Sequence, residues 1–219
     1  MKEKNVLCLD DSNTILRKII GDSDAPFVYE KLGVRYEHFL LDEFQDTSCV
    51  QWDNFCPLLQ ESDSNNRDNL LVGDVKQSIY RWRGSDWKLL DKTVPSTFPR
   101  HEEDVLDTNY RSLANVVNFN NCFFNSAAQI LDAMTDNPSF GSMARIYSDV
   151  KQRVGRKASA AGRVSISFCD ETLELDKVLE AVKEARNHGA LFSEIAVLVR
   201  SNAIGERVAT FLIDNGVPV

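Results

Sequence analysis

The chain has 219 residues and a formal net charge of −8, from 25 Lys and Arg against 33 Asp and Glu. With 43% hydrophobic and 26% charged residues, its composition is that of a globular protein and excludes disordered and fibrous classes. The net negative charge excludes a protein that coats nucleic acid through a basic surface, but a local basic binding site remains possible.

The hydrophobic pattern alternates between helical and strand periods, at a length that suits one large domain or two small ones. A first helix is predicted with Asp11 or Ser12 as its cap and Gly21 at its end. The next predicted elements, in chain order, are a strand buried on both faces at 38–43, a helix at 48–59 that carries Val50, Phe55, Leu58 and Leu59, and a loop at 61–69. Strands at 69–74 and 105–106, a long helix at 112–132, strands at 163–168 and 194–200, and helices at 173–185 and 203–213 complete the predicted elements. Strands that alternate with helices predict an α/β fold with a mainly parallel sheet.

Five scattered cysteines, with no Cys-x-x-Cys pair, predict reduced thiols in a cytoplasmic protein. Apolar runs fall short of the roughly 7–15 residues of a secretory signal and the about 20 of a membrane span. We therefore expect no membrane partner. One segment, 144–164, is strongly basic, with Asp149 as its single acidic residue; its six basic residues are Arg145, Lys151, Arg153, Arg156, Lys157 and Arg163. Either a solvated flexible loop or a phosphate-contacting loop fits this pattern.

Two of the predicted strands end in acidic residues, Asp42 and Glu43 after the first and Asp74 after the second. Ligands of open α/β sheets bind outside the carboxyl ends of the strands. An aspartate there can hold Mg²⁺, and an adjacent glutamate can take a proton from an attacking water. A strand-end aspartate alone can also be only a helix cap.

Three motifs extend this acidic pattern: DEFQDTS at 42–48, VGDVKQSIYRWRG at 72–84 and NYRS at 109–112. Together they resemble the superfamily-one DNA helicases of the UvrD/RecB type. Because a lysine precedes the glutamine in GDVKQ, the chain resembles the RecB and AddA subunits of helicase–nuclease complexes more than it resembles UvrD itself. The resemblance implies two partial RecA-like domains of the P-loop NTPase type, 1–103 with the Walker B and GDxxQ motifs and 104–219 with NYRS, joined near 99–103.

The resemblance also implies a role for each motif residue around ATP. Asp42 would be the Mg²⁺ ligand, Glu43 the general base for water attack, and Gln77 the contact to the γ-phosphate. Tyr110 would stack on the adenine, and Arg111 would be the arginine finger, a type of residue worth about 10³–10⁵ in rate. Asp42 and Glu43 are then expected to face Arg111 across a cleft.

On the DNA side, the resemblance implies that Tyr80, Trp82 and Arg83 contact single-stranded DNA. Base–aromatic stacking contributes roughly 1–3 kcal/mol per base without reading sequence. Plainer structural roles stay open: Trp82 as a core anchor, Arg111 as a salt-bridge partner, and Gln77 as a backbone contact at a helix start. Gln45 and Asp46 are expected to orient neighbouring side chains.

A phosphate-binding loop, G-x-x-x-x-G-K-[ST], is missing from the motifs, since none of the ten glycines precedes a lysine. We therefore expect this sequence to cover the middle of a motor and to be inactive in ATP hydrolysis alone. ATP and Mg²⁺ would act in the complete enzyme, which translocates on single-stranded DNA in recombination or repair. Its partners would be the missing motor segments and, in a helicase–nuclease complex, further subunits.

Two other functions are compatible with the same residues. The first is a non-catalytic remnant or a DNA-binding or interaction module that keeps the fold without the activity. The second is a metal-dependent hydrolase or nuclease that uses Asp42, Glu43 and Asp46 on two ions, which would leave NYRS and GDVKQ without an explanation.

Overall fold

The computed structural model describes residues 9–20, 36–134, 143–155 and 162–219, which form a helix-rich α/β structure with two small parallel sheets. Its contacts divide the chain into two compact units, Met1–Gly162 (unit 1) and Arg163–Val219 (unit 2). No helix in the described part is long and apolar enough to cross a membrane.

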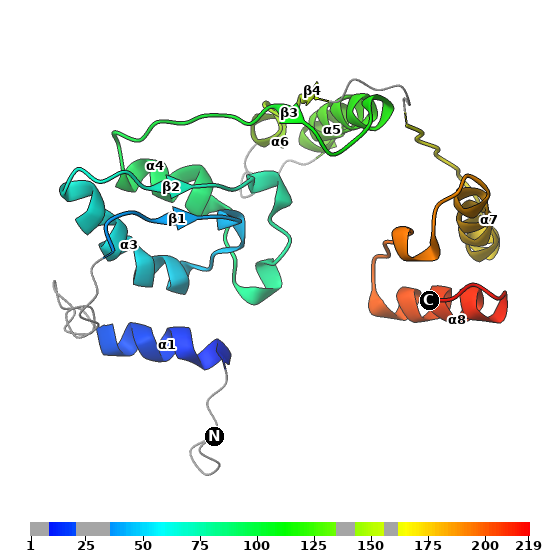
Figure 1. Ribbon diagram of the computed structural model, residues 1–219, viewed down its shortest axis with the longest axis horizontal. Helices are drawn as coiled ribbons and strands as arrows, with labels where there is room; N and C mark the ends of the chain where they lie inside the picture. Colours follow the sequence, from blue (N-terminus) through cyan, green and yellow to red (C-terminus); the bar gives the residue numbers. More distant parts are fainter. Residues whose placement is uncertain (1–8, 21–35, 135–142, 156–161) are drawn as a thin grey trace, which may run out of the picture. The chain divides into compact units, whose positions relative to one another are not determined.

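In unit 1, the helices α1 (Leu9–Ile20) and α3 (Cys49–Ser64) pack on each other (Figure 1). Asp11 and Ser12 are not the caps that we predicted, because α1 already begins at Leu9; the predicted end at Gly21 lies outside the described residues. An ion pair between Arg17 and Asp53, 3.1 Å long, joins the two helices.

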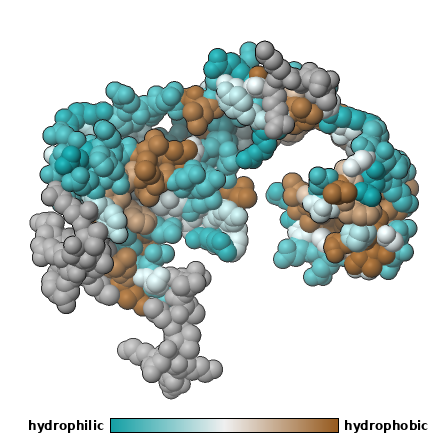
Figure 2. Space-filling view, viewed as in Figure 1, coloured by the Kyte–Doolittle hydropathy of each residue, from teal (hydrophilic) through white to brown (hydrophobic). Residues whose placement is uncertain are grey.

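Strands β1 (Leu40–Leu41) and β2 (Leu70–Leu71) pair in parallel, with Leu40 opposite Leu70. The predicted strands and their direction are confirmed, but they are shorter than predicted and not buried on both faces. Leu40 is 76% and Leu70 52% exposed, whereas Leu41 and Leu71 pack against the core. Figure 2 shows hydrophobic surface over this small sheet. Among the described residues only one face of the sheet is covered.

The core of unit 1 lies between this sheet and α3. Its buried residues are Phe44, Trp52, Leu59, Leu89 and Val94. The predicted helix is confirmed as α3; of the apolar residues predicted on it, Leu59 is buried, whereas Val50 and Phe55 are 36% and 41% exposed. Trp52 takes the core position instead, with its ring edge-on to Phe44 at 5.6 Å.

Helix α3 runs through Ser64, so the predicted loop at 61–69 begins later than expected. The chain then passes through β2, the 3₁₀ turns η2 (Val75–Gln77) and η3 (Arg81–Arg83), the π-helix η4 (Leu89–Thr93) and α4 (Val94–Thr97). Another 3₁₀ turn, η1 (Phe44–Asp46), follows β1. The turns η1 and η2 thus follow the two strands of the sheet.

A second parallel pair joins β3 (Thr108–Asn109) to β4 (Arg153–Val154), beside α5 (Ala114–Met134) and α6 (Met143–Ile146). The strand predicted at 105–106 is wrong, since those residues are 59% and 83% exposed. The pairing starts later in the chain: Arg153 N–H donates to the Asp107 carbonyl at 2.7 Å, and Gly155 N–H donates to the Asn109 carbonyl at 2.9 Å. The long helix is confirmed as α5.

Unit 2 consists of α7 (Glu174–Asn187), α8 (Asn202–Asp214) and the turns η6 (Glu171–Leu173) and η7 (Phe192–Glu194). Both predicted helices are confirmed. Their shared core is Leu179, Val182, Val208, Leu212 and Val217. The strands predicted at 163–168 and 194–200 are wrong: within the described residues neither pairs with another strand, and Phe168 and Leu198 are 98% and 95% exposed.

Candidate functional site

The predicted acidic residues lie at one edge of the first sheet, because β1 and β2 are parallel and end together. A hydrogen bond of 2.9 Å from Phe44 N–H to the Val72 carbonyl continues the pairing past the strands. It brings the turn after β1 next to the turn after β2. We call Asp42, Glu43, Gln45, Asp74 and Gln77 the strand-end cluster.

Gln45 holds the two turns of the strand-end cluster together. Its side chain is buried, with 3% exposed; Nε2 donates to Glu43 Oε2 at 2.6 Å, and Oε1 accepts the Asp74 N–H at 3.0 Å. Gly73 leaves room for this amide, since a Cβ there would lie 2.8 Å from Gln45 Oε1. The orienting role predicted for Gln45 therefore has a structural basis, whereas sequence reasoning missed Gly73.

Asp74 caps η2 and gathers its donors. Oδ1 accepts the Lys76 N–H at 2.9 Å and lies 3.0 Å from Lys76 Nζ, and Oδ2 accepts from Gln77 Nε2 at 3.0 Å. Partial burial raises the pKa of Asp74, but the hydrogen bonds from Gln77 and Lys76 outweigh it and hold the pKa below its ordinary value. The Gln77 side chain thus contacts a carboxylate, not only backbone as in the plainer interpretation.

Glu43 has a left-handed backbone, with φ 52° and ψ 37°. A non-glycine residue in this region stores strain on the order of 1–3 kcal/mol. The Asp42 carboxylate accepts the Glu43 N–H at 2.9 Å. This conformation turns the chain sharply after β1 and leaves both acidic residues exposed.

The carboxylates at this edge could bind a Mg²⁺ ion whose other ligands are mostly phosphate oxygens and waters. In the described residues no cluster of three or more His, Cys, Asp or Glu is placed to hold a metal. Within the described residues the exposed Asp42 carboxylate accepts one hydrogen bond, from the Glu43 N–H, and has acceptor capacity left. Mg²⁺ bound by one or two carboxylates, with phosphates and waters completing its octahedron, matches such a site.

In the aromatic motif after η2, Trp82 and Arg83 are exposed and Tyr80 is half-buried. Trp82 is 76% exposed and Ile79 71%, so the alternative of Trp82 as a core anchor is wrong. The Arg83 guanidinium carbon lies 4.8 Å from the centre of the Trp82 ring and 5.5 Å from that of Tyr80. Cation–π attraction of this kind holds the three side chains together.

Tyr110 and Arg111 follow β3, where Asn109 shapes the turn. Asn109 Oδ1 accepts the N–H groups of Arg111 at 3.0 Å and Ser112 at 2.8 Å, and its Nδ2 donates to Gln152 Oε1 at 2.8 Å. Arg111 is exposed, and among the described residues it forms no ion pair. The turn therefore fixes the backbone and leaves the guanidinium extended into solvent.

One face of Tyr110 is covered by Gly155, the residue that follows β4. A Cβ at Gly155 would lie 2.6 Å from Tyr110 Cδ1 and 2.9 Å from Thr108 Cγ2. The ring is nevertheless 68% exposed. Sequence reasoning missed Gly155 and Gln152, because their contacts depend on the pairing of β3 with β4.

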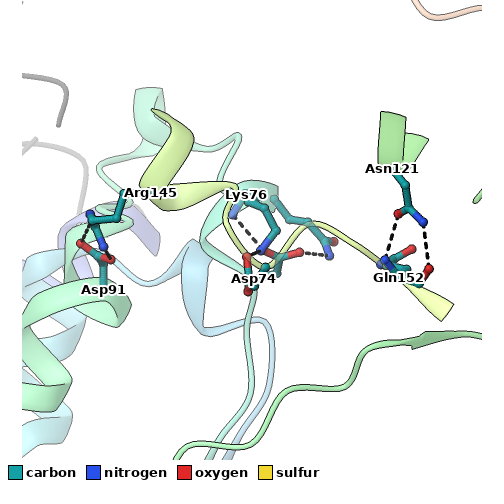
Figure 3. A network of polar contacts seen from close by, with 8 residues as sticks. Asp74, Lys76, Asp91, Asn121, Arg145 and Gln152 are labelled. Atoms are coloured by element: carbon teal, nitrogen blue, oxygen red, sulfur yellow. Dashed lines mark hydrogen bonds and ion pairs between the residues drawn. The ribbon is translucent and has the colours of Figure 1, made fainter. Parts of the chain in front are cut away.

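The basic segment 144–164 contains ordered elements, α6 and β4, and is not simply a flexible loop. Three of its cations form ion pairs: Arg145 with Asp91, Arg153 with Asp107, and Arg163 with Glu184. Arg156 and Lys157 lie outside the described residues. Figure 3 shows the pair between Arg145 and Asp91. The acidic member of the segment, Asp149, reaches the chain that follows β2, 2.9 Å from Lys76 Nζ.

The predicted site residues thus form three groups: Asp42, Glu43 and Gln77 in the strand-end cluster, Tyr80 with Trp82 and Arg83, and Tyr110 with Arg111. Within the described part of the chain, no hydrogen bond or ion pair joins Arg111 directly to Asp42 or Glu43. Their meeting over one phosphate remains a prediction.

Two family models match the chain: the UvrD/REP helicase N-terminal domain over residues 1–97 and the UvrD-like helicase C-terminal domain over 105–219. Among curated proteins, the RecBCD enzyme subunit RecB of Chlamydia trachomatis is 34% identical over 197 residues, covering 87% of this chain and 18% of that protein. DNA helicase II of Escherichia coli is 27% identical over 197 residues, 89% of this chain and 24% of that protein.

A third relative, the ATP-dependent DNA helicase Rep of Buchnera aphidicola, is 26% identical over 219 residues, 100% of this chain and 29% of that protein. The chain thus spans less than a third of the length of these three relatives. The two family matches account for both halves of the sequence and include all three motifs. The chain therefore belongs to the family of UvrD-like superfamily-one helicases.

Proposed function

We propose that the chain is part of the motor of an ATP-dependent DNA helicase or translocase that acts on single-stranded DNA in recombination or repair. The observation that carries this proposal is the strand-end cluster, in which Gln45 and Asp74 place Glu43 and Gln77 at one sheet edge. The names of the relatives, which include DNA helicase II and RecB, support the substrate class.

Residues 1–103 would then be part of a first RecA-like domain, and 104–219 part of a second. The family matches at 1–97 and 105–219 support this division, although the contacts of the structure group 104–162 with the residues before it. ATP hydrolysis would need the motor segments that carry the phosphate-binding loop. Helicase–nuclease subunits as partners and a cytoplasmic location belong to the same proposal.

In the complete enzyme, Asp42 would hold Mg²⁺, which neutralises charge on the phosphates of ATP. Glu43 would accept a proton from the attacking water, and its hydrogen bond to the buried Gln45 amide fixes the carboxylate for that role. Gln77, held by Asp74, would contact the γ-phosphate. Tyr110 offers its open face to the adenine, and Arg111 would stabilise the charge of the transition state.

Single-stranded DNA would bind at the aromatic motif. Trp82 presents an open ring beside the half-buried Tyr80, and Arg83 contacts both rings. Stacking of bases on such rings is tolerant of sequence, which suits a motor that moves over any DNA.

The test is binding of a fluorescently labelled oligonucleotide, measured by anisotropy with the 219-residue chain. Trp82→Ala is expected to weaken binding by about 5- to 150-fold, the loss of one stacked base at roughly 1–3 kcal/mol. Phe168→Ala is the matched control, because Phe168 is an aromatic residue with 98% of its surface exposed and lies outside the motifs. Equal affinities for Trp82→Ala and the unmodified chain would contradict the DNA site and favour a fragment without this function.

A further inference from the structure

We infer that Asp149 and Gln152 are positioning residues that tie the Gln77 turn to the turn carrying Arg111. The inference rests on the proposed function, since it is the roles of Gln77 and Arg111 that give this connection its meaning. The two residues lie three positions apart on the segment between α6 and β4, and each reaches a different turn.

A first series of contacts connects Asp149 to Gln77 through Lys76 and Asp74. Asp149 Oδ1 lies 2.9 Å from Lys76 Nζ, and the same Nζ lies 3.0 Å from Asp74 Oδ1. Asp74 in turn accepts from the Gln77 side-chain amide. Lys76 is only 19% exposed on its side chain, so the ammonium group sits between the two carboxylates, as Figure 3 shows for Lys76 and Asp74.

Asp149 therefore helps to fix the position of the Lys76 ammonium group beside the Asp74 carboxylate. With both carboxylates present, the ammonium divides its three donors between them and keeps a fixed place. If the charge of Asp149 is removed, Lys76 is left with Asp74 as its one carboxylate partner among these contacts. The aspartate that holds Gln77 is then less well fixed.

A second series of contacts connects Gln152 to the backbone of Arg111 through Asn109. Gln152 Oε1 accepts from the Asn109 side chain at 2.8 Å, and Asn109 Oδ1 accepts the backbone N–H groups of Arg111 and Ser112. The main chain of Gln152 is held by the side chain of Asn121 on α5, whose Nδ2 donates to the Gln152 carbonyl and whose Oδ1 accepts the Gln152 N–H, both at 2.9 Å (Figure 3). The amide of Gln152 thus fixes the orientation of the Asn109 side chain.

Two more contacts hold the start of this segment in place. Arg145 of α6 forms a bidentate pair with Asp91 at 2.9 and 2.8 Å, and the Asp91 side chain is only 12% exposed. Asp132 of α5 accepts the N–H groups of Met143 and Ala144 at the beginning of α6. Because the segment is anchored on both sides, a displacement of Gln77 is transmitted through it to Asn109 rather than absorbed by a free loop.

The test is amide hydrogen exchange of the 219-residue chain, measured by NMR without ATP or DNA. Asp149→Asn is expected to speed exchange of the Gln77 N–H, which donates to the Asp74 carbonyl at 2.9 Å, by at least about threefold, the effect of a partly exposed ion pair. Through the connection it should also speed exchange at Ser112. Gln152→Ala should also speed exchange at both amides, but with the larger increase in rate at Ser112 and the smaller at Gln77.

Asp149→Glu keeps the charge and should restore exchange at both amides. Glu180→Gln is the control, since it breaks the Lys177–Glu180 ion pair on α7 and leaves the segment intact. If Asp149→Asn leaves Gln77 exchange unchanged, or if each variant affects only its own turn, the inference is overturned. Neither result depends on nucleotide or DNA, so this failure is distinct from failure of the proposed function.

Discussion

Asp74 connects most of the polar groups at the edge of the first sheet. Its backbone N–H reaches the buried Gln45, and its carboxylate accepts from both Lys76 and Gln77. Removing one partner from such a network leaves the others without a hydrogen bond, at a cost of about 1–3 kcal/mol for a buried group. The Asp74 carboxylate therefore holds the η2 turn, and the Asp74 backbone N–H connects this turn to Gln45 in η1.

The lowered pKa of Asp74 predicts a stability that depends on pH. Because the folded state holds the pKa below its ordinary value, the charged carboxylate stabilises the fold above the unfolded pKa, at about 4, and this contribution is lost as the pH falls through the folded value. We expect Asp74→Asn to reduce the loss of unfolding free energy in acid, measured by urea unfolding at a series of pH values. The exposed Asp68, substituted by Asn, is the control; an unchanged acid slope for Asp74→Asn would contradict the prediction.

Sequence motifs predict the candidate site residues but not the residues that contact them. Asp42, Glu43 and Gln77 lie in contiguous patterns next to strand ends, so a local signal is enough to predict that they lie at one edge of the sheet. Gly155 and Gln152 have no local signal, because their importance arises only when β4 pairs with β3. A sequence without a known pairing register cannot assign such contacts.

Helices were predicted more accurately than strands. The spacing of apolar residues that indicates a helix lies within one contiguous segment. The bounds of α5, α7 and α8 accordingly lie within a few positions of the predicted ones. A strand needs a neighbour to satisfy its backbone groups. Residues 163–168 and 194–200 have the apolar composition of strands, but within the described chain no strand pairs with them, so composition alone overpredicted the sheets.

The N-terminus of α3 offers a test at the scale of one helix. Ser48 accepts the Gln51 N–H at 3.3 Å, and the Gln51 side chain accepts the Ser48 N–H at 2.9 Å, a complete capping box. Ser48→Ala is expected to lower the unfolding free energy of unit 1 by about 1 kcal/mol, because it removes one cap bond. Ser64→Ala, at the other end of the helix, should stay within about 0.5 kcal/mol. Equal values for the two variants in urea unfolding would contradict the role of the box.

The whole chain consists of two units with separate cores. Unit 1 is built around Phe44, Trp52 and Leu59, and unit 2 around the shared face of α7 and α8. Because no buried core residue belongs to both clusters, each unit is expected to respond separately to damage in its own core.

Leu212→Ala tests this independence. Leu212 is 4% exposed in the core of unit 2, and its truncation is expected to cost about 2–5 kcal/mol. Hydrogen exchange should speed up throughout α7 and α8 while the amides of α3 and α5 keep their rates. Ile213→Ala, on the same helix at a position 58% exposed, should change little. Faster exchange in both units would show that they unfold together.

The ion pair between Asp91 and Arg145 has a consequence for how the polypeptide is divided into expression fragments. A cut near residue 100 follows the family matches, but it removes Arg145 from a carboxylate that is only 12% exposed. The same cut separates Lys76 from Asp149. A fragment that ends at Gly162 keeps both pairs, so we expect it to be more stable in solution than a fragment cut near residue 100, since a partly buried carboxylate without its counter-ion destabilises the fold.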